Sequence, residues 1–295
     1  MDPLDHASEL LRTGQREACR PLLEACLADA EASDADRLRA TLLRASLHGD
    51  DGEMQDAIAA ADRAISMARW LGDGAAEAEA LCLRASNALR LGLVRDVVED
   101  SAASLALGRA LGHGRLQANA LRVMSNLALR QGDEDEARRL LEQSLACARE
   151  GRDDESEFWA LNNLSNVIGI QAARHADGGD RDAARPLVAE LVQVVEQALQ
   201  VAERTGHWLH RAYAIANLAD AYIVDGDHVR ARELVQEYAG LARQGHAPRL
   251  LAYANLDEVR LYRAEGRIDE AIAVIDCDAH RRFLHGNDDL ALSSE

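Results

Sequence analysis

The sequence offers few side chains in the arrangements that catalysis or metal binding requires. His207 and His210 have the HxxH spacing that places two imidazoles close together on a helix, but a stable zinc site needs three or four ligands. We therefore predict that this pair starts or packs a helix and that the chain holds no metal. The five cysteines are Cys19, Cys26, Cys82, Cys147 and Cys277. None belongs to a CxxC pair, which predicts reduced thiols filling small core positions.

The sequence also lacks the motifs typical of nucleophilic catalysis and of phosphate binding. There is no GxSxG, HExxH or GxGxxG pattern, and all 33 basic residues are arginine. A P-loop and a Schiff base both need the amine of a lysine. Acidic pairs such as Asp153-Asp154 stand where helices begin, and there they complement the helix dipole. We expect a chain that is not an enzyme and carries no cofactor.

The net charge of the chain disfavours partners that are themselves negatively charged. At −18, the chain repels phosphate backbones and anionic lipid surfaces, which disfavours nucleic-acid and membrane partners. The start, MDPLDHASEL, has acidic residues in place of the basic and apolar regions of a secretory signal. No apolar stretch is long enough to span a bilayer. The expected location is the cytoplasm.

Composition and glycine spacing predict repeated helical hairpins. Alanine and leucine dominate the apolar residues, and prolines number only four, which favours helix. Two interleaved glycine series share a period of about 40 residues, as expected for stacked helix–turn–helix units. The first series is Gly14, Gly52, Gly92, Gly132, Gly179, Gly226 and Gly266, and the second is Gly72, Gly112, Gly151, Gly206, Gly245 and Gly286. Each glycine is expected to end a helix in left-handed backbone.

The units also share their small residues. Segments 125–151, 219–245, 261–275 and 56–72 each place an alanine soon after the turn: Ala137, Ala231, Ala271 and Ala57. This pattern resembles the tetratricopeptide repeat (TPR) family in a long form. In the family's pattern a small residue faces a close helix contact in the first helix, and the resemblance implies this place for Ala85, Ser125, Ser165 and Ala219. Val259 is bulkier there, which predicts looser packing. The resemblance implies an all-α fold, a right-handed α-solenoid of tandem helix–turn–helix repeats.

The expected organisation is a single array over 1–295. Its units are 3–33, 35–72, 74–112, 114–151, an elongated 153–206, 208–245 and 248–286. Residues 287–295 read as the start of a further helix that is cut short. The elongated unit predicts a protruding hairpin with its tip at 173–185, which is either a plain insertion or a binding element.

The TPR resemblance implies that the first helices of successive units line a concave face. The lining positions are Glu79, Cys82, Ser86, Arg90, Asn119, Arg122, Asn126, Arg130, Trp159, Asn162, Asn166, Arg174, Tyr213, Asp220, Asn255, Arg260 and Arg263. Arginine can hold a carboxylate and asparagine can bond a peptide backbone, while the aromatics add contact area. We therefore predict a groove for an extended or helical peptide of acidic character. Ordinary solvated or inter-repeat hydrogen-bonding residues are the alternative interpretation.

Three functional readings follow. The leading hypothesis is a protein-interaction or sensory module in bacterial signalling, a setting in which such repeats are common. The second is the regulatory input region of a diguanylate cyclase or a similar output enzyme encoded beyond residue 295. The third is a stand-alone scaffold. An uncapped end of the array would also expose an apolar helix face through which two copies could pair.

Overall fold

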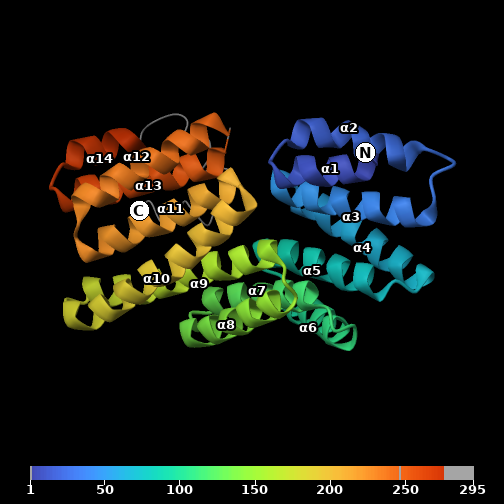
Figure 1. Ribbon diagram of the computed structural model, residues 1–295, viewed down its shortest axis with the longest axis horizontal. Helices are drawn as coiled ribbons and strands as arrows, with labels where there is room; N and C mark the ends of the chain where they lie inside the picture. Colours follow the sequence, from blue (N-terminus) through green and yellow to red (C-terminus); the bar gives the residue numbers. More distant parts are fainter. Residues whose placement is uncertain (1, 246, 276–295) are drawn as a thin grey trace. The chain divides into compact units, whose positions relative to one another are not determined.

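The computed structural model describes residues 2–245 and 247–275, and its regular elements in these ranges are α-helices (Figure 1). They are α1 (Pro3–Arg12), α2 (Arg16–Ala28), α3 (Asp34–Asp51), α4 (Met54–Leu71), α5 (Gly74–Arg90), α6 (Val94–Ala110), α7 (Gly114–Arg130), α8 (Glu134–Glu150), α9 (Asp154–Asp177), α10 (Arg181–Thr205), α11 (Trp208–Asp225), α12 (His228–Gln244), α13 (Pro248–Ala264) and α14 (Ile268–Ile275). The fold is thus all-α.

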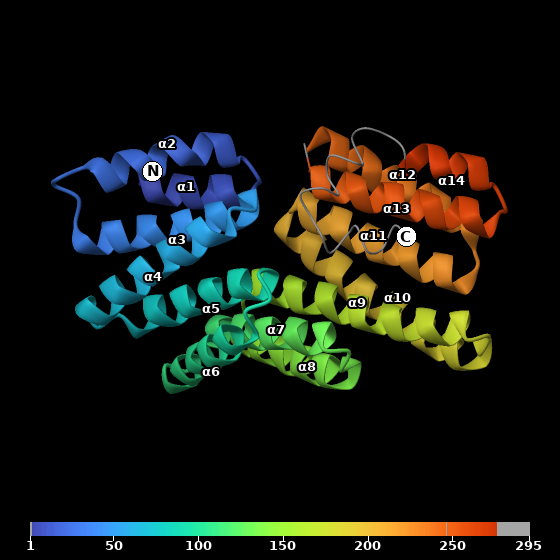
Figure 2. The ribbon, with the colours of Figure 1, turned by 180° about the vertical axis from the view of Figure 1, so that it is seen from behind.

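The chain divides into two compact units, and the division falls inside α9. The first is Met1–Ala160 and the second begins at Leu161. In the first unit α3 packs on α5 and α5 packs on α7, and each of the three packs on the second helix of its own hairpin. In the second unit α11 packs on α13 in the same way, and α11 to α14 lie side by side in both views (Figures 1 and 2). This is the packing of an α-solenoid, and one continuous array over the chain stays a prediction.

Glycines end most of the helices, but not all for the reason expected. Ten of them, including Gly52 and Gly132, have positive φ. Gly151 and Gly245 do not: they close α8 and α12 with φ of −74° and −89°. A Cβ on Gly151 would lie 3.1 Å from the Cα of Gly114, and one on Gly245 would lie 1.9 Å from the Trp208 ring. The expectation of left-handed backbone is therefore wrong at these two positions. Glycine is needed there because any side chain would collide with the facing residue.

Small side chains let the helices of each unit approach closely. Ala85, Ser125 and Ala219, on three different first helices, are at most 1% exposed. Buried serines bond the two helices of a hairpin: the Ser104 hydroxyl donates to the Ala78 carbonyl over 2.7 Å, and the Ser144 hydroxyl to the Ala118 carbonyl over 2.8 Å. Each bond satisfies a polar group that would otherwise be buried without a partner.

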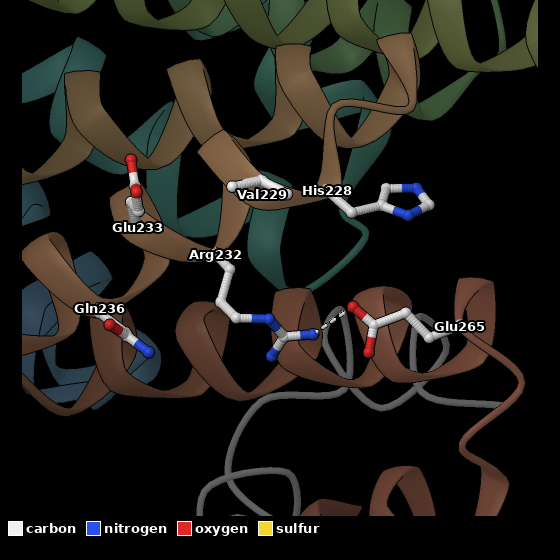
Figure 3. A pocket seen from close by; sticks show the side chains of 6 residues that line it. All are labelled: His228, Val229, Arg232, Glu233, Gln236 and Glu265. Atoms are coloured by element: carbon white, nitrogen blue, oxygen red, sulfur yellow. Dashed lines mark hydrogen bonds and ion pairs between the residues drawn. The ribbon is translucent and has the colours of Figure 1, made fainter.

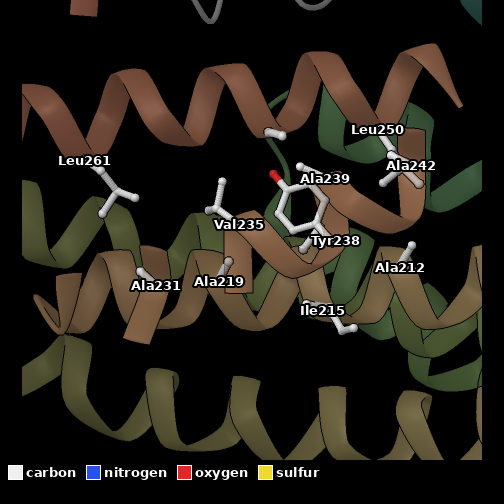
Figure 4. Close-up of a cluster of buried hydrophobic side chains, with 12 residues drawn as sticks. Ala212, Ile215, Ala219, Ala231, Val235, Tyr238, Ala239, Ala242, Leu250 and Leu261 are labelled. Atoms are coloured by element: carbon white, nitrogen blue, oxygen red, sulfur yellow. The ribbon is translucent and has the colours of Figure 1, made fainter. Parts of the chain in front are cut away.

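The core of α11 to α13 is built around one aromatic ring. Tyr238 on α12 is fully buried among Ile215 of α11 and Leu250 and Leu261 of α13 (Figure 4). Alanines at Ala219 and Ala231 leave room for the close crossing of α11 and α12. Val259 is only 4% exposed, so this bulkier residue is also accommodated in the interior.

The helices α9 and α10 are longer than their neighbours. They have 24 and 25 residues, against 17 each in α7 and α8. Within the described ranges no helix is both long and apolar enough to cross a bilayer. Cys277, Gly286, the end of the unit 248–286 and the helix expected from residue 287 all lie outside the described residues.

Candidate peptide-binding face

In the first unit, the predicted lining residues of α5 and α7 lie on matching positions 40 residues apart. Residues three and four apart on a helix share a face, and α5 and α7 pack against each other. The set is Glu79, Cys82, Ser86 and Arg90 from α5, with Arg115, Asn119, Arg122, Asn126 and Arg130 from α7. We call this set the α5–α7 face. Sequence reasoning missed Arg115, although it stands one turn before Asn119.

Arg122 lies at the middle of the α7 part of this face. It is half-buried, its Nε atom is fully covered, and it makes no hydrogen bond or ion pair with the described residues. The acid on the same face is already engaged, because Arg115 pairs with Glu79 over 3.0 Å. The guanidinium of Arg122 is therefore held in place by burial while its charge lacks a carboxylate.

Asn119 and Asn126 flank Arg122, one turn before it and one turn after it. Both side chains are half-buried. An amide can donate and accept at once, which suits it to bond a peptide backbone. Arg122 and its two flanking amides thus present donors and acceptors along one edge of α7.

Arg90 and Arg130 on the same face join neighbouring helices. Nη1 of Arg90 donates to the carbonyl of Gly49 over 2.6 Å, and Nη1 of Arg130 donates to the carbonyl of Leu89 over 3.1 Å. In both cases the acceptor stands 41 residues earlier, near the end of the preceding first helix. These bonds match the alternative interpretation of the lining residues, in which they bond one repeat to the next.

Cys82 forms part of the floor of the α5–α7 face. It is 7% exposed, and burial raises the pKa of its thiol to about 11. The thiol is therefore protonated near neutral pH, and a protonated thiol is a weak nucleophile. Its role here is packing.

Trp159, the last predicted lining residue of the first unit, is half-buried on α9. Its ring stands edge-to-face on Phe158 at 5.3 Å, and its Nε1 donates to Glu155 over 2.7 Å. The ring therefore has a fixed orientation, as an aromatic contact residue requires.

In the second unit, the asparagines of α9 have different surroundings. Asn162 is only 6% exposed, and its Oδ1 accepts from Nδ2 of Asn217 over 3.0 Å. The same Asn217 amide donates to Ser165 over 2.7 Å. Asn162 thus bonds α9 to α11 in the interior, whereas Asn166 and Arg174 are exposed.

The remaining predicted residues lie on α11 and α13. Tyr213 is partly buried against the core around Tyr238, and Asn255 is half-buried. Arg260 bonds Asp220 and also donates to Asp257 over 3.2 Å. Arg263 is exposed at the end of α13.

Asp257 is a buried carboxyl group within this second set. The hydroxyl of Tyr238 donates to its Oδ2 over 2.7 Å. Burial, reinforced by the charge of Asp220, raises the pKa of Asp257 to about 8, against the opposing effects of Arg260 and Tyr238. Arg260 is thus engaged by the side chains of both Asp220 and Asp257.

The HxxH pair opens α11. His207 and His210 are both buried, and their rings stack at 3.9 Å with 13° between their planes. His207 is the residue before α11 and its side chain caps no backbone group, so the predicted role of the pair in packing the helix stays a prediction.

A shallow cavity of about 270 Å³ lies away from the first-helix residues, on α12 and the residue that follows α13 (Figure 3). Its lining is His228, Val229, Arg232, Glu233, Gln236 and Glu265. Arg232 bridges it by pairing with Glu265 over 2.6 Å, and its guanidinium also lies 5.2 Å from the centre of the Tyr262 ring. The lining charges are mixed and already paired in part, so the cavity selects no ligand class.

Comparison with solved structures defines the fold class. BtubC from P. vanneervenii superposes with a TM-score of 0.56 at 20% identity, over 77% of this chain and 90% of that one. A Rap protein in complex with competence and sporulation factor superposes with a TM-score of 0.64 at 14% identity. The match covers 99% of this chain and 89% of the Rap protein chain. TPR-like repeats of a putative kinesin light chain from Podosopora anserina superpose with a TM-score of 0.48 at 18% identity. The match covers 71% of this chain and 96% of the other chain. No family profile matches the sequence, and no curated protein matches it. The chain therefore shares its helical fold with BtubC and with the Rap protein.

Proposed function

We propose that this chain is a protein-interaction module that binds an acidic peptide segment of its partner on the α5–α7 face. The observation that carries the proposal is Arg122, a half-buried arginine that pairs with no carboxylate of the described residues, on a face that gathers four arginines. The chain as a whole carries a charge of −18, so this concentration of cations runs against the overall composition. A partially buried guanidinium binds a carboxylate more strongly than an exposed one does.

The proposed roles differ along the face. Arg122 receives a side-chain or terminal carboxylate, and Asn119 and Asn126 bond the peptide backbone on either side of it. Arg90 and Arg130 fix the spacing of α3, α5 and α7 through their carbonyl bonds and so keep the face in shape. No described residue needs to react chemically, and the proposed activity is binding.

The proposed setting is cytoplasmic regulation in a bacterium. A Rap protein of the same fold has been solved in complex with competence and sporulation factor, which supports a regulatory use of such a fold. In this setting the segment bound on the face would belong to a signalling partner. Control of an output enzyme, such as a diguanylate cyclase, is the narrower form of the same proposal.

Selection from a displayed library of random 12-residue peptides tests the proposal. We expect the selected peptides to be enriched in Asp and Glu. We also expect Arg122→Ala/Asn126→Ala to weaken their binding about tenfold or more, since a charge-assisted hydrogen bond contributes roughly 1.5–3 kcal/mol. Fluorescence anisotropy at two salt concentrations measures the affinities.

A matched control removes the same charge and one amide elsewhere. Arg63 on α4 and Gln143 on α8 are exposed residues of second helices, and Arg63→Ala/Gln143→Ala should leave the affinity unchanged. The proposal would be contradicted if the selected peptides showed no enrichment in Asp and Glu. It would also be contradicted if the two double variants lost the same amount of peptide affinity.

A further inference from the structure

Three side chains with metal-binding atoms converge at the turn between α3 and α4. His48 lies in the last turn of α3, Glu53 immediately precedes α4, and Asp56 lies in its first turn. Each offers one ligand atom, and these atoms all lie within 4.8 Å of one another. The closest pair is Nδ1 of His48 and Oε2 of Glu53, at 2.5 Å.

This turn differs from three of the equivalent turns in the other hairpins. Asp133, Asp180 and Asp227 each follow a turn glycine, and each accepts a hydrogen bond from a backbone N–H of the helix that it begins. Glu53 follows Gly52 in the same way but caps nothing, and its carboxylate reaches back to His48. The helix start therefore loses a favourable cap, while the carboxylate joins an imidazole.

His48 stands where the next two units have alanine. Forty and eighty residues further on, the same position holds Ala88 and Ala128, both buried. In the α3 unit the site instead presents an imidazole whose side chain is 19% exposed, next to Glu53 at 44%. This exposure leaves an ion and its remaining water ligands room to enter.

The backbone closes the turn between His48 and Glu53 without help from their side chains. The N–H of Glu53 donates to the carbonyl of His48 over 2.8 Å, and Gly52 takes a φ of 81° to close the turn. Next to His48, the carbonyl of Gly49 accepts the bond from Arg90 of α5. The turn therefore keeps His48 and Glu53 near each other before an ion binds, which lowers the free energy needed to bring them together.

The surrounding charges permit a cation. Arg20, the cation that acts on Glu53, pairs with Asp51 over 2.7 Å. The nearby positive charge is thus partly neutralised, and two carboxylates remain to balance a divalent ion.

We propose that His48, Glu53 and Asp56 form a binding site for a divalent transition-metal ion of the zinc type. One imidazole and two carboxylates supply three protein ligands, and water completes a four-coordinate shell. Mg²⁺ and Ca²⁺ fit less well, because they favour oxygen ligands alone. For Nδ1 to bind the ion, the ring carries its proton on Nε2, and the 2.5 Å separation from Glu53 widens to about 3.3 Å, as two ligands of one tetrahedral ion require.

Titration of the full chain with Zn²⁺ against a fluorescent chelator tests this site. We expect His48→Ala to weaken the tightest Zn²⁺ binding at least tenfold. His113→Ala, which removes an exposed histidine beside α7, should leave that binding unchanged. Mg²⁺ at a hundredfold excess should not displace the Zn²⁺.

Glu53→Asp is the more telling variant because it introduces the residue type that caps the helix in the turns of Asp133, Asp180 and Asp227. Its shorter carboxylate should cap α4, as Asp133 caps α8, and should no longer reach His48. Zn²⁺ affinity should therefore fall about tenfold while the melting temperature in chelator stays the same or rises. Wild-type affinity in both His48→Ala and Glu53→Asp, or displacement by Mg²⁺, would overturn the site.

Discussion

Gly114 and Gly151 pack backbone against backbone at the open end of the α7–α8 hairpin, opposite its turn. A Cβ placed on Gly114 would lie 2.5 Å from the carbonyl oxygen of Cys147 and 2.8 Å from the Cα of Gly151. Neither neighbour is a side chain that could rotate away. The first residue of α7 and the residue after α8 can therefore approach this closely only as glycines.

Replacing Gly114 with alanine should lower the free energy of unfolding by roughly 1–3 kcal/mol, because the methyl group must displace backbone. Gly74 begins α5 in the same way, but a Cβ there would meet only a side-chain carbon of Leu111 at 3.8 Å. Gly74→Ala should therefore leave stability unchanged or slightly higher. Urea unfolding followed by circular dichroism compares the two, and equal effects would contradict the packing account.

Arg84 bonds two carboxylates that differ in burial and therefore in their expected contributions to stability. It contacts Asp100 through two bonds of 2.7 Å and Asp62 through one of 2.5 Å. Asp100 is 5% exposed, whereas the side chain of Asp62 is 52% exposed. Asp100→Ala should cost about 3 kcal/mol, since it breaks a largely buried pair, and Asp62→Ala less than about 1 kcal/mol. Thermal unfolding at low and high salt measures both losses, and the reverse order would refute this ranking.

The buried carboxyl group of Asp257 should make stability depend on pH. Its pKa is raised to about 8 in the folded protein from about 3.9 in an unfolded chain. The folded state therefore binds the extra proton, and the stability from this group is complete below about pH 4 and is lost as the pH rises towards 8. Melting temperatures from pH 5 to 8 should fall less steeply in Asp257→Asn than in the wild type. The same slope in both proteins would show that Asp257 is ionised throughout.

The bond from Arg130 to Leu89 should contribute to the stability of the first unit. Arg130→Ala leaves a helix-end carbonyl without this donor and should cost about 1 kcal/mol. Arg95 is the control, because its side chain is 86% exposed and pairs only along its own helix. Arg95→Ala should change stability by less than about 0.5 kcal/mol. Chemical denaturation resolves this difference, and indistinguishable midpoints would count against a stabilising role for the Arg130 bond.

Much of the fold could be predicted because its determinants are local in sequence. The glycine series and the small residues repeat at a fixed period, and each turn needs only the residues next to it. The exceptions, Gly151 and Gly245, depend on what faces them across the hairpin: the backbone of Gly114 and the ring of Trp208. A contact of that kind leaves no mark in the spacing of the glycines.

The candidate face was harder to predict, because position on a helix does not show what a side chain bonds. Arg90, Arg122 and Arg130 belong to one face, yet two of them donate to carbonyls of a neighbouring helix and one makes no described bond. Asn162 was expected on the face and is bonded to Asn217 in the interior. The cluster of His48, Glu53 and Asp56 was missed because its three residues match no established motif.

The carbonyl bonds of Arg90 and Arg130 also bear on how such a chain could have grown. Donor and acceptor are separated by 41 residues in both bonds, about the length of one hairpin unit. A gene duplication that inserts one such unit would bring its own arginine and its own acceptor carbonyl, each already in register with the copies beside it. The part built from α3, α5 and α7 could thus lengthen or shorten by whole units through recombination, without a new contact having to evolve at each junction.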